Sequence, residues 1–344
     1  MKPIHFVPDA STQHLSEQDS KRYFSTVGLA VFALAAVNFV VQILLALLAR
    51  NFLPTAWKTS PLFSYLLSMI PLYLFALPVF LLLLRRLPAV RPLSQPIKAS
   101  AWFGGLCVAF LFMQIGNYIG QVLMNWMALI TRHSFENPVS DITSGSPVWL
   151  NLIFLAILAP VLEELVFRKL LCDRLLPLGE GYAVVISGIA FGLFHGNFFQ
   201  FFYACALGIL FAYVYVKSGK IIWSMLYHVV INLLGDVFAG WLVDKIDPEA
   251  LIDFLTEAAE TGVYNIAAIE GQLPYLILLA CYSFILYGLA IVGLIYLIRM
   301  RKKIRLESGL LPPPSEKRIS NVLLTPGIAL AIAFFAFLFV FSLL

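Results

Sequence analysis

The stretch that decides the fold runs from Ile153 to Leu171 and reads IFLAILAPVLEELVFRKLL. It is an apolar segment of helical length that contains two adjacent carboxylates, Glu163 and Glu164, followed by Arg168. An ionisable side chain inside a membrane span is rare, because removing it from water costs at least about 2.5 kcal/mol on insertion scales. Such residues mark functional sites by default. We therefore expect other spans to supply partners for these carboxylates.

The composition is that of a membrane protein. Of the 344 residues, 61% are apolar and only 12% are charged, whereas soluble domains are about 45–50% apolar and about 25% charged. The sequence therefore predicts an all-α polytopic integral membrane protein in a lipid bilayer. The four cysteines lie in apolar stretches without CxxC spacing, which is typical of small core residues.

Apolar runs of roughly 20 residues, the length that crosses ~30 Å of hydrocarbon, predict about nine spans. The fifth and sixth are the least secure, because only Gly196 and Asn197 separate them. The predicted spans are 24–49, 62–84, 101–130, 147–171, 182–196, 198–216, 221–243, 273–298 and 322–344.

The distribution of basic residues predicts the orientation. With a cytoplasmic N-terminus, 19 of the 23 Lys and Arg residues fall in cytoplasmic segments, with Arg168 and Lys169 counted among them. The positive-inside rule then predicts an external C-terminus, and the compact loops favour a bacterial plasma membrane. The four external basic residues are Arg50, Lys58, Arg132 and Lys245. The net charge of +4 reflects this loop bias, so we expect no nucleic-acid partner.

The chain divides into three predicted regions. Residues 1–146 hold a tail and three spans, residues 147–243 a four-helix core, and residues 244–344 an external loop and two spans. The close pair Gly116 and Gly120 in the third span is typical of tight helix packing.

Two loops differ from the others. Residues 244–272 carry seven acids against one lysine, and Asp247-Pro248 is typical of a helix start. An amphipathic helix on the membrane and a solvated connector are both compatible with this loop. Residues 306–320, with three consecutive prolines, predict a flexible cytoplasmic linker.

Ionisable residues within the predicted spans gather in the core region. Helical spacing places Glu164 and Arg168 on one face, where they can form an ion pair, while Glu163 is rotated by ~100°. His195 follows Phe191 by four residues in the fifth span. In the seventh span, His228, Asn232 and Asp236 form a stripe at four-residue spacing. Glu163, His195, His228 and Asn232 are therefore expected to converge, with Asp236 at a rim.

The expected depth of these residues agrees for two of them. At ~1.5 Å per residue, Glu163 lies ~12 Å and His228 ~10 Å from the cytoplasmic ends of their spans. His195 lies ~20 Å from its own, so the fifth span either tilts or forms a short hairpin with the sixth.

A carboxylate, two imidazoles and an amide suit the activation of water and the stabilisation of an oxyanion. Glu163, His195 and His228 could also ligate a zinc ion. The chain has no HExxH, GxSxG, Walker or dinucleotide-binding motif. Hydrolysis within the membrane is the chemistry that remains.

The ordered set Glu163-Glu164-xxx-Arg168, Phe191-xxx-His195 and His228-xxx-Asn232 resembles the CPBP family, which comprises CAAX proteases and bacteriocin-processing enzymes of the Abi group. The resemblance covers about residues 147–243. It implies an intramembrane endopeptidase in which Glu163 activates water and His195 helps to hold it. His228 and Asn232 would bind the oxyanion or complete a metal site, and Glu164 and Arg168 would fix the helix and could meet the substrate. The resemblance is compatible with zinc and with a metal-free glutamate mechanism.

Two other functions remain open from the sequence. The same helices could form a non-proteolytic bacteriocin immunity or scaffold protein, or the Glu and His residues could relay protons in a transporter. For a peptidase, the substrate could be a prenylated C-terminal motif, a bacteriocin leader, a pheromone precursor or another membrane protein.

Overall fold

The computed structural model describes residues 14–143, 145–314 and 318–344. It is 80% helical, and the described residues contain no strand. The prediction of an all-α polytopic membrane protein is therefore confirmed. Lys2 and Lys317, which entered the charge count, lie outside the described residues.

In the part of the chain that the structure describes, seven helices are long and apolar enough to cross a membrane. The predicted fifth and ninth spans correspond to shorter apolar helices of 15 and 16 residues, so the count of nine is not confirmed. The helices that flank the core are α1 (Glu17–Phe52), α2 (Thr55–Lys58), α3 (Pro61–Ile70), η1 (Pro71–Ala76), α4 (Leu77–Leu84), α5 (Ala99–Thr131), α6 (Pro138–Thr143), α14 (Pro248–Thr261), η6 (Ile266–Ile269), α15 (Leu273–Met300), η7 (Arg301–Lys303), α16 (Arg318–Leu323) and α17 (Pro326–Phe341).

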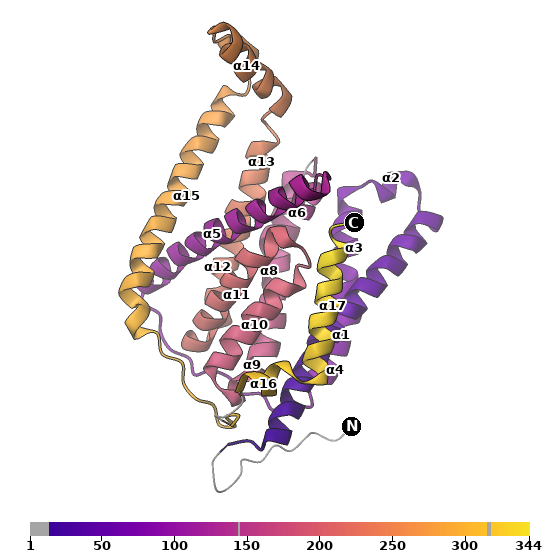
Figure 1. Cartoon of the computed structure of the whole chain (residues 1–344), viewed down its shortest axis with the longest axis vertical. Helices are drawn as coiled ribbons and strands as arrows, with labels where there is room; N and C mark the ends of the chain where they lie inside the picture. The colour runs from indigo at the N-terminus through magenta and orange to yellow at the C-terminus, as the bar shows by residue number, and fades with distance from the viewer. Residues whose placement is uncertain (1–13, 144, 315–317) are drawn as a thin grey trace.

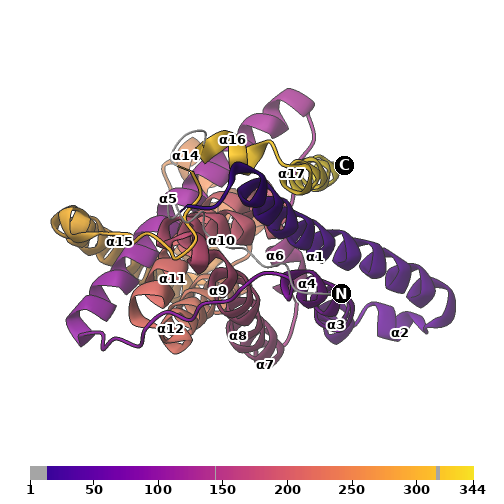
Figure 2. The ribbon, with the colours of Figure 1, turned by 90° about the horizontal axis from the view of Figure 1, so that it is seen from below.

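The core lies in the middle of the molecule (Figure 1). The helix α1, the α3–α4 segment and α17 flank it on one side, and α15 flanks it on the other, in both views (Figures 1 and 2). The core elements are α7 (Val148–Asn151), η2 (Leu152–Leu158), α8 (Ala159–Glu164), η3 (Leu165–Cys172), α9 (Asp173–Leu175), η4 (Leu176–Leu178), α10 (Glu180–Phe194), α11 (Phe198–Ser218), α12 (Ile221–Asn232), η5 (Leu233–Phe238) and α13 (Ala239–Val243).

Small residues allow α11 to approach two neighbours closely. On α10, a Cβ atom at Gly192 would collide with the Cys205 backbone of α11. On α5, a Cβ atom at Gly120 would come within 2.8 Å of the Phe198 carbonyl oxygen. Gly116 likewise faces the Tyr203 backbone, as its pairing with Gly120 predicts.

The short α10 accounts for the anomalous depth of His195. At ~1.5 Å per residue its 15 residues extend ~22 Å, less than ~30 Å of hydrocarbon. The helix ends at Phe194, and the turn at Gly196, which has a φ of 65°, leads directly into α11. Of the two alternatives, the structure thus supports a short hairpin.

The helix that carries the two glutamates is not a regular α-helix. The α8 turn, which holds them, lies between the π-helical segments η2 and η3. π-Helical turns are rare and frequently occur at functional sites. A π-helical turn also contains more residues than an α-helical turn, so it changes which side chains share a helix face. The faces predicted from the sequence assume a regular α-helix.

Residues 244–272 contain the predicted helix. Asp247 caps α14 by accepting hydrogen bonds from the backbone N–H groups of Glu249 (3.0 Å) and Ala250 (3.2 Å). The proposed apolar face is not buried as a unit, because Leu255 is 56% exposed while Ala258 is buried. In Figure 1, α14 lies at the tip of the molecule, beyond the other helices.

The prediction of a flexible linker is wrong for residues 306–312, which we call the strap. The strap crosses the turn between η4 and α10, where Glu307 accepts from the backbone N–H of Glu180 (3.0 Å). The backbone N–H of Leu311 donates to the Pro177 carbonyl (2.7 Å). Gly309 lies so close to Pro177 that a Cβ atom could not be accommodated. These long-range contacts leave no local signal in the sequence.

Candidate active site

Both glutamates face the same imidazole ring. The Nε2 atom of His228 lies 3.6 Å from an Oε2 atom of Glu163, and its Nδ1 atom lies 3.3 Å from Oε1 of Glu164. The sequence predicted only Glu163 in this position. The two carboxylates differ in access to solvent, because the side chain of Glu163 is 21% exposed and that of Glu164 is fully buried.

The predicted ion pair between Glu164 and Arg168 is present. Their Oε2 and Nε atoms are 3.2 Å apart, and both side chains are fully buried. Arg168 also donates from Nη1 to the hydroxyl of Ser187 (2.9 Å), which in turn donates to the Phe167 carbonyl (2.8 Å). A buried carboxylate is tolerated only when paired and hydrogen-bonded, so this network keeps Glu164 charged beside His228. The burial of Arg168 also corrects the count of basic residues in cytoplasmic segments, because Arg168 is a core residue and not a loop residue.

Phe191 holds the two histidines and the arginine in one arrangement. Its ring centroid lies 4.9 Å from that of His195 and 5.4 Å from that of His228, with edge-to-face geometry in both cases. The guanidinium carbon of Arg168 lies 5.0 Å from the same centroid. Aromatic pairs of this geometry contribute about 0.5–1.5 kcal/mol beyond burial. Ser187, Phe191 and His195 share the four-residue spacing of one helix face, a signal that could have revealed Ser187.

His195 has one ring nitrogen committed to the backbone. Its Nδ1 atom lies 2.9 Å from the Phe191 carbonyl oxygen, which can only accept a hydrogen bond. The proton of a neutral ring is therefore on Nδ1, and Nε2 carries a lone pair that can accept a proton. His195 interacts electrostatically with Glu163 and His228, which places it in the same cluster.

Asn232 has a structural role that follows from Pro160. In the π-helical turn, the Ala159 N–H donates to the Phe154 carbonyl five residues back. In the same hydrogen-bond pattern, residue 160 would donate its backbone N–H to the Leu155 carbonyl. Residue 160 is a proline, which has no N–H. Asn232 donates from Nδ2 to this Leu155 oxygen at 3.0 Å. Since an amide nitrogen carries two hydrogens, one of them remains for another acceptor.

Tyr73 of η1 and Asp236 of η5 add polar groups near Glu163, and Tyr65 of α3 lies near Asp236. Tyr65 donates to the Asn151 side chain at 2.6 Å, and Tyr73 interacts electrostatically with Glu163. Asp236 interacts electrostatically with Glu163 and His228 and is half-buried. The prediction that Asp236 lies at a rim therefore understates its closeness to the site. Tyr65 was not predicted because it is remote in sequence, and Asn151 was not predicted because it belongs to no motif, although it lies in the same predicted span as Glu163.

The zinc site predicted at Glu163, His195 and His228 stays a prediction. In the described ranges, no group of three or more His, Cys, Asp or Glu side chains has an arrangement that could hold one. One ring nitrogen of each histidine is directed at a carbonyl or carboxylate oxygen, which is also the usual arrangement of a histidine that binds a metal through its other nitrogen.

Comparisons with known proteins point to the same segment. Residues 145–234 match the family model described as "Type II CAAX prenyl endopeptidase Rce1-like". All six predicted site residues, from Glu163 to Asn232, fall within the match. The matched segment of this chain is similar to the CPBP family of membrane proteases.

Two curated bacterial proteins are similar to this chain. "UPF0177 protein YxdF" of Lactococcus lactis is 27% identical over 140 residues, which cover 40% of this chain and 76% of that protein. "Putative membrane peptidase YdiL" of Bacillus subtilis is 28% identical over 95 residues, which cover 27% of this chain and 38% of that protein. No solved structure matches the chain.

Proposed function

We propose that this protein is an intramembrane endopeptidase that hydrolyses a peptide bond with a glutamate-activated water. The observation that carries the proposal is the unequal exposure of the two carboxylates on His228. Glu163 is reached by solvent and can bind a water, whereas Glu164 is sealed in the ion pair with Arg168. The family match and the peptidase relative support a membrane protease in general.

The proposed reaction begins with a water between Glu163 and His195. Glu163 accepts a proton from the water, and Nε2 of His195 accepts a hydrogen bond from it, while the water oxygen attacks the peptide carbonyl carbon. The carbonyl oxygen becomes an oxyanion, which the Nε2–H of His228 and the second amide hydrogen of Asn232 stabilise. Glu163 then returns the proton to the leaving amine nitrogen as the C–N bond breaks.

Glu164 and Arg168 act through His228 in this mechanism. The mechanism uses His228 with a hydrogen on both ring nitrogens: Nδ1 faces the Glu164 carboxylate, 3.3 Å away, and Nε2 presents its hydrogen on the side of Glu163. Because both Glu164 and Arg168 are fully buried, direct contact with a substrate does not fit their positions.

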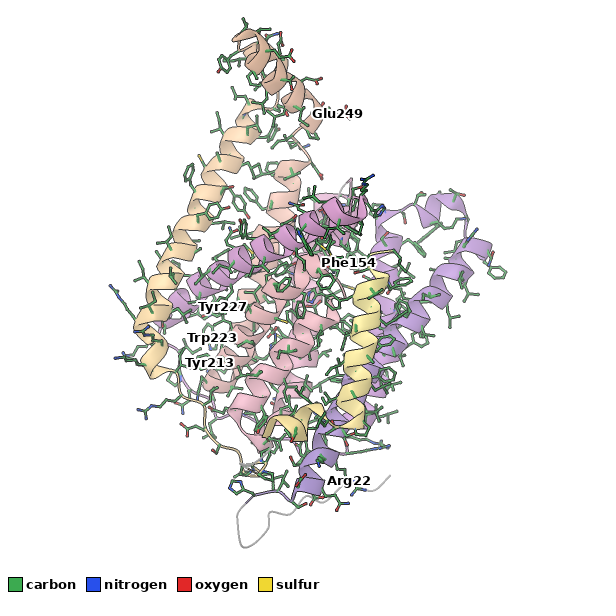
Figure 3. The ribbon with its side chains drawn as sticks, viewed as in Figure 1. Arg22, Phe154, Tyr213, Trp223, Tyr227 and Glu249 are labelled. Atoms are coloured by element: carbon green, nitrogen blue, oxygen red, sulfur yellow. The ribbon has the colours of Figure 1, made fainter. Side chains whose placement is uncertain are left out.

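The test uses the purified chain in liposomes with two quenched fluorescent peptides. One carries a C-terminal prenylated cysteine motif and the other a hydrophobic leader. Glu163→Gln should lower the cleavage rate by about 10²–10⁴-fold, the usual contribution of a general base. The matched control is Glu249→Gln on the exposed start of α14, which lies at the tip of the molecule in Figure 3 and should cleave as the native chain does.

Two outcomes separate this proposal from the other functions. Full cleavage by Glu163→Gln would contradict the assigned role of that residue. No cleavage by the native chain, together with partner binding that Glu163→Gln leaves intact, would favour a scaffold or immunity protein. A chelator arm tests metal dependence, and the proposed mechanism predicts an unchanged rate.

A further inference from the structure

A large cavity lies on the α15 side of the core, away from the candidate active site. It has a volume of about 1030 Å³, is lined by α5, α10, α11 and α15, and is partly open to its surroundings. Its wall is mostly apolar, with Val108, Leu210 and Leu297 among the lining residues. Tyr213 and Tyr227 also line it, and Figure 3 shows both on the side that faces α15. None of the six predicted site residues is among the described residues that line it.

Two chain segments close one end of the cavity. Residues 90–98 pass beneath it, where the Val90 N–H donates to the Asp173 carbonyl (2.7 Å) and the Gln95 N–H to the Ser218 carbonyl (2.8 Å). The strap, together with Ile304, closes the other part of this end. The cavity therefore has a floor at one end, while it is partly open between the helices.

The closed end carries positive charge. Arg91 and Lys98 line the cavity and are exposed, and the described residues place no carboxylate within ion-pair distance of either. Two acids also line the cavity, but Glu180 is already paired with Lys217 and with the backbone N–H of Glu307. Only the exposed Glu307 carboxylate opposes the two cations locally. Five further basic residues follow at the end of α15, namely Arg299, Arg301, Lys302, Lys303 and Arg305.

We propose that this cavity binds one phospholipid with an anionic headgroup. One acyl chain occupies the apolar lumen between α5 and α11, and the phosphate lies between Arg91 and Lys98. A peptide strand suits the lumen less well, because its backbone N–H and C=O groups would need partners that an apolar wall does not offer. A basic residue near an anionic lipid contributes about fivefold in affinity, since it is worth about 1 kcal/mol.

The occupant would contact the elements that carry the active site. Tyr227 lines the cavity and directly precedes His228, and Leu176 lines it just after the helix of Glu163. The Tyr227 hydroxyl is fixed by a hydrogen bond to the Trp102 carbonyl of α5 (2.6 Å). A bound lipid would thus hold α5 and α12 at their present separation. This proposal does not depend on proteolysis.

The test is native mass spectrometry of the full chain in detergent, titrated with phosphatidylglycerol or with phosphatidylcholine of the same acyl chains. We expect one phosphatidylglycerol per chain to bind at least about tenfold more tightly than phosphatidylcholine. The Arg91→Glu/Lys98→Glu variant should lose this preference. The charge-matched control, Arg22→Glu/Arg85→Glu, changes two exposed cations that do not line the cavity and should keep it.

A second variant tests the apolar lumen. Ala101→Phe places bulk inside the cavity without changing charge, and it should weaken the binding of both lipids at this site. Elution volume and melting temperature without added lipid verify that each variant is folded, and Arg91→Gln/Lys98→Gln replaces the reversal variant if that one is not. Equal affinity of the native chain for the two lipids, or an equal loss of preference in the charge-matched control, would overturn the proposal.

Discussion

Two neighbouring glutamates have different environments because their partners differ. Glu164 is enclosed by Arg168, and its carboxylate also faces Nδ1 of His228. Glu163 faces the other ring nitrogen and keeps 21% of its side chain exposed. A single histidine thus joins a buried carboxylate, which can only orient it, to an accessible one, which can take part in hydrolysis. The difference between them arises from helix phase and from the position of Arg168.

The ion pair of Glu164 predicts a large effect on stability. Arg168→Met should lower the free energy of unfolding by about 3–5 kcal/mol, because it leaves a fully buried carboxylate without its cation. Adding Glu164→Gln to Arg168→Met should restore much of the loss. Thermal unfolding in detergent measures both changes.

The exposed pair Lys21–Glu17 provides the control for this prediction, with Nζ and Oε1 2.6 Å apart. Lys21→Met should change stability by less than about 1 kcal/mol, as is usual for surface pairs. A small effect of Arg168→Met, similar to that of the control, would contradict the structural role of the buried pair.

At the scale of elements, the π-helical turn before α8 determines how the glutamate helix meets α12. Pro160 removes the donor that the Leu155 carbonyl would use, and Asn232 supplies one from α12. An unsatisfied backbone carbonyl in a membrane protein costs free energy, so this bond fixes α12 against η2. The residue that is proposed to bind the oxyanion is therefore also a brace between two elements.

This arrangement predicts a coupling between Asn232 and Pro160. Asn232→Ala alone should destabilise the protein by about 1–3 kcal/mol, since it leaves a buried carbonyl unsatisfied. With Pro160→Ala also present, a restored N–H can serve Leu155, and Asn232→Ala should cost clearly less. Unfolding midpoints of the four proteins give the coupling energy. Additive effects would show that Asn232 does not substitute for the missing N–H.

The sequence could predict the chemistry of the core but not its detailed register. The Glu164–Arg168 pair was predictable, because four-residue spacing in a helix is a local property. The contact of Glu164 with His228 was not, since it depends on the distance between α8 and α12. The π-helical turns and the strap were likewise out of reach, because both result from packing between segments that are far apart in the chain.

At the scale of the whole molecule, opposite charges occupy opposite ends. Figure 3 shows Glu249 of the acidic loop at one end and Arg22 at the other. The basic residues around Arg91 and after α15 belong to the end of Arg22. The positive-inside rule then predicts that Arg22 is cytoplasmic and Glu249 external.

Labelling of single cysteines tests this orientation. In a Cys281→Ser background, which removes the exposed native thiol, Glu249→Cys should react with a membrane-impermeant maleimide on intact bacterial cells. Arg22→Cys should react only after permeabilisation. The opposite pattern would contradict the orientation and would place the basic end of the lipid cavity outside the cell.

The central claim is that Glu163 and His228 act as one catalytic unit within the membrane. The most direct measurement is kcat/KM for the native chain, Glu163→Gln, His228→Ala and the double variant, with one cleaved peptide. Residues that act as a unit give strongly non-additive losses, so we predict that the double variant is about as slow as the slower single variant. If the two losses multiply, or if either single variant retains the native rate, the account is contradicted.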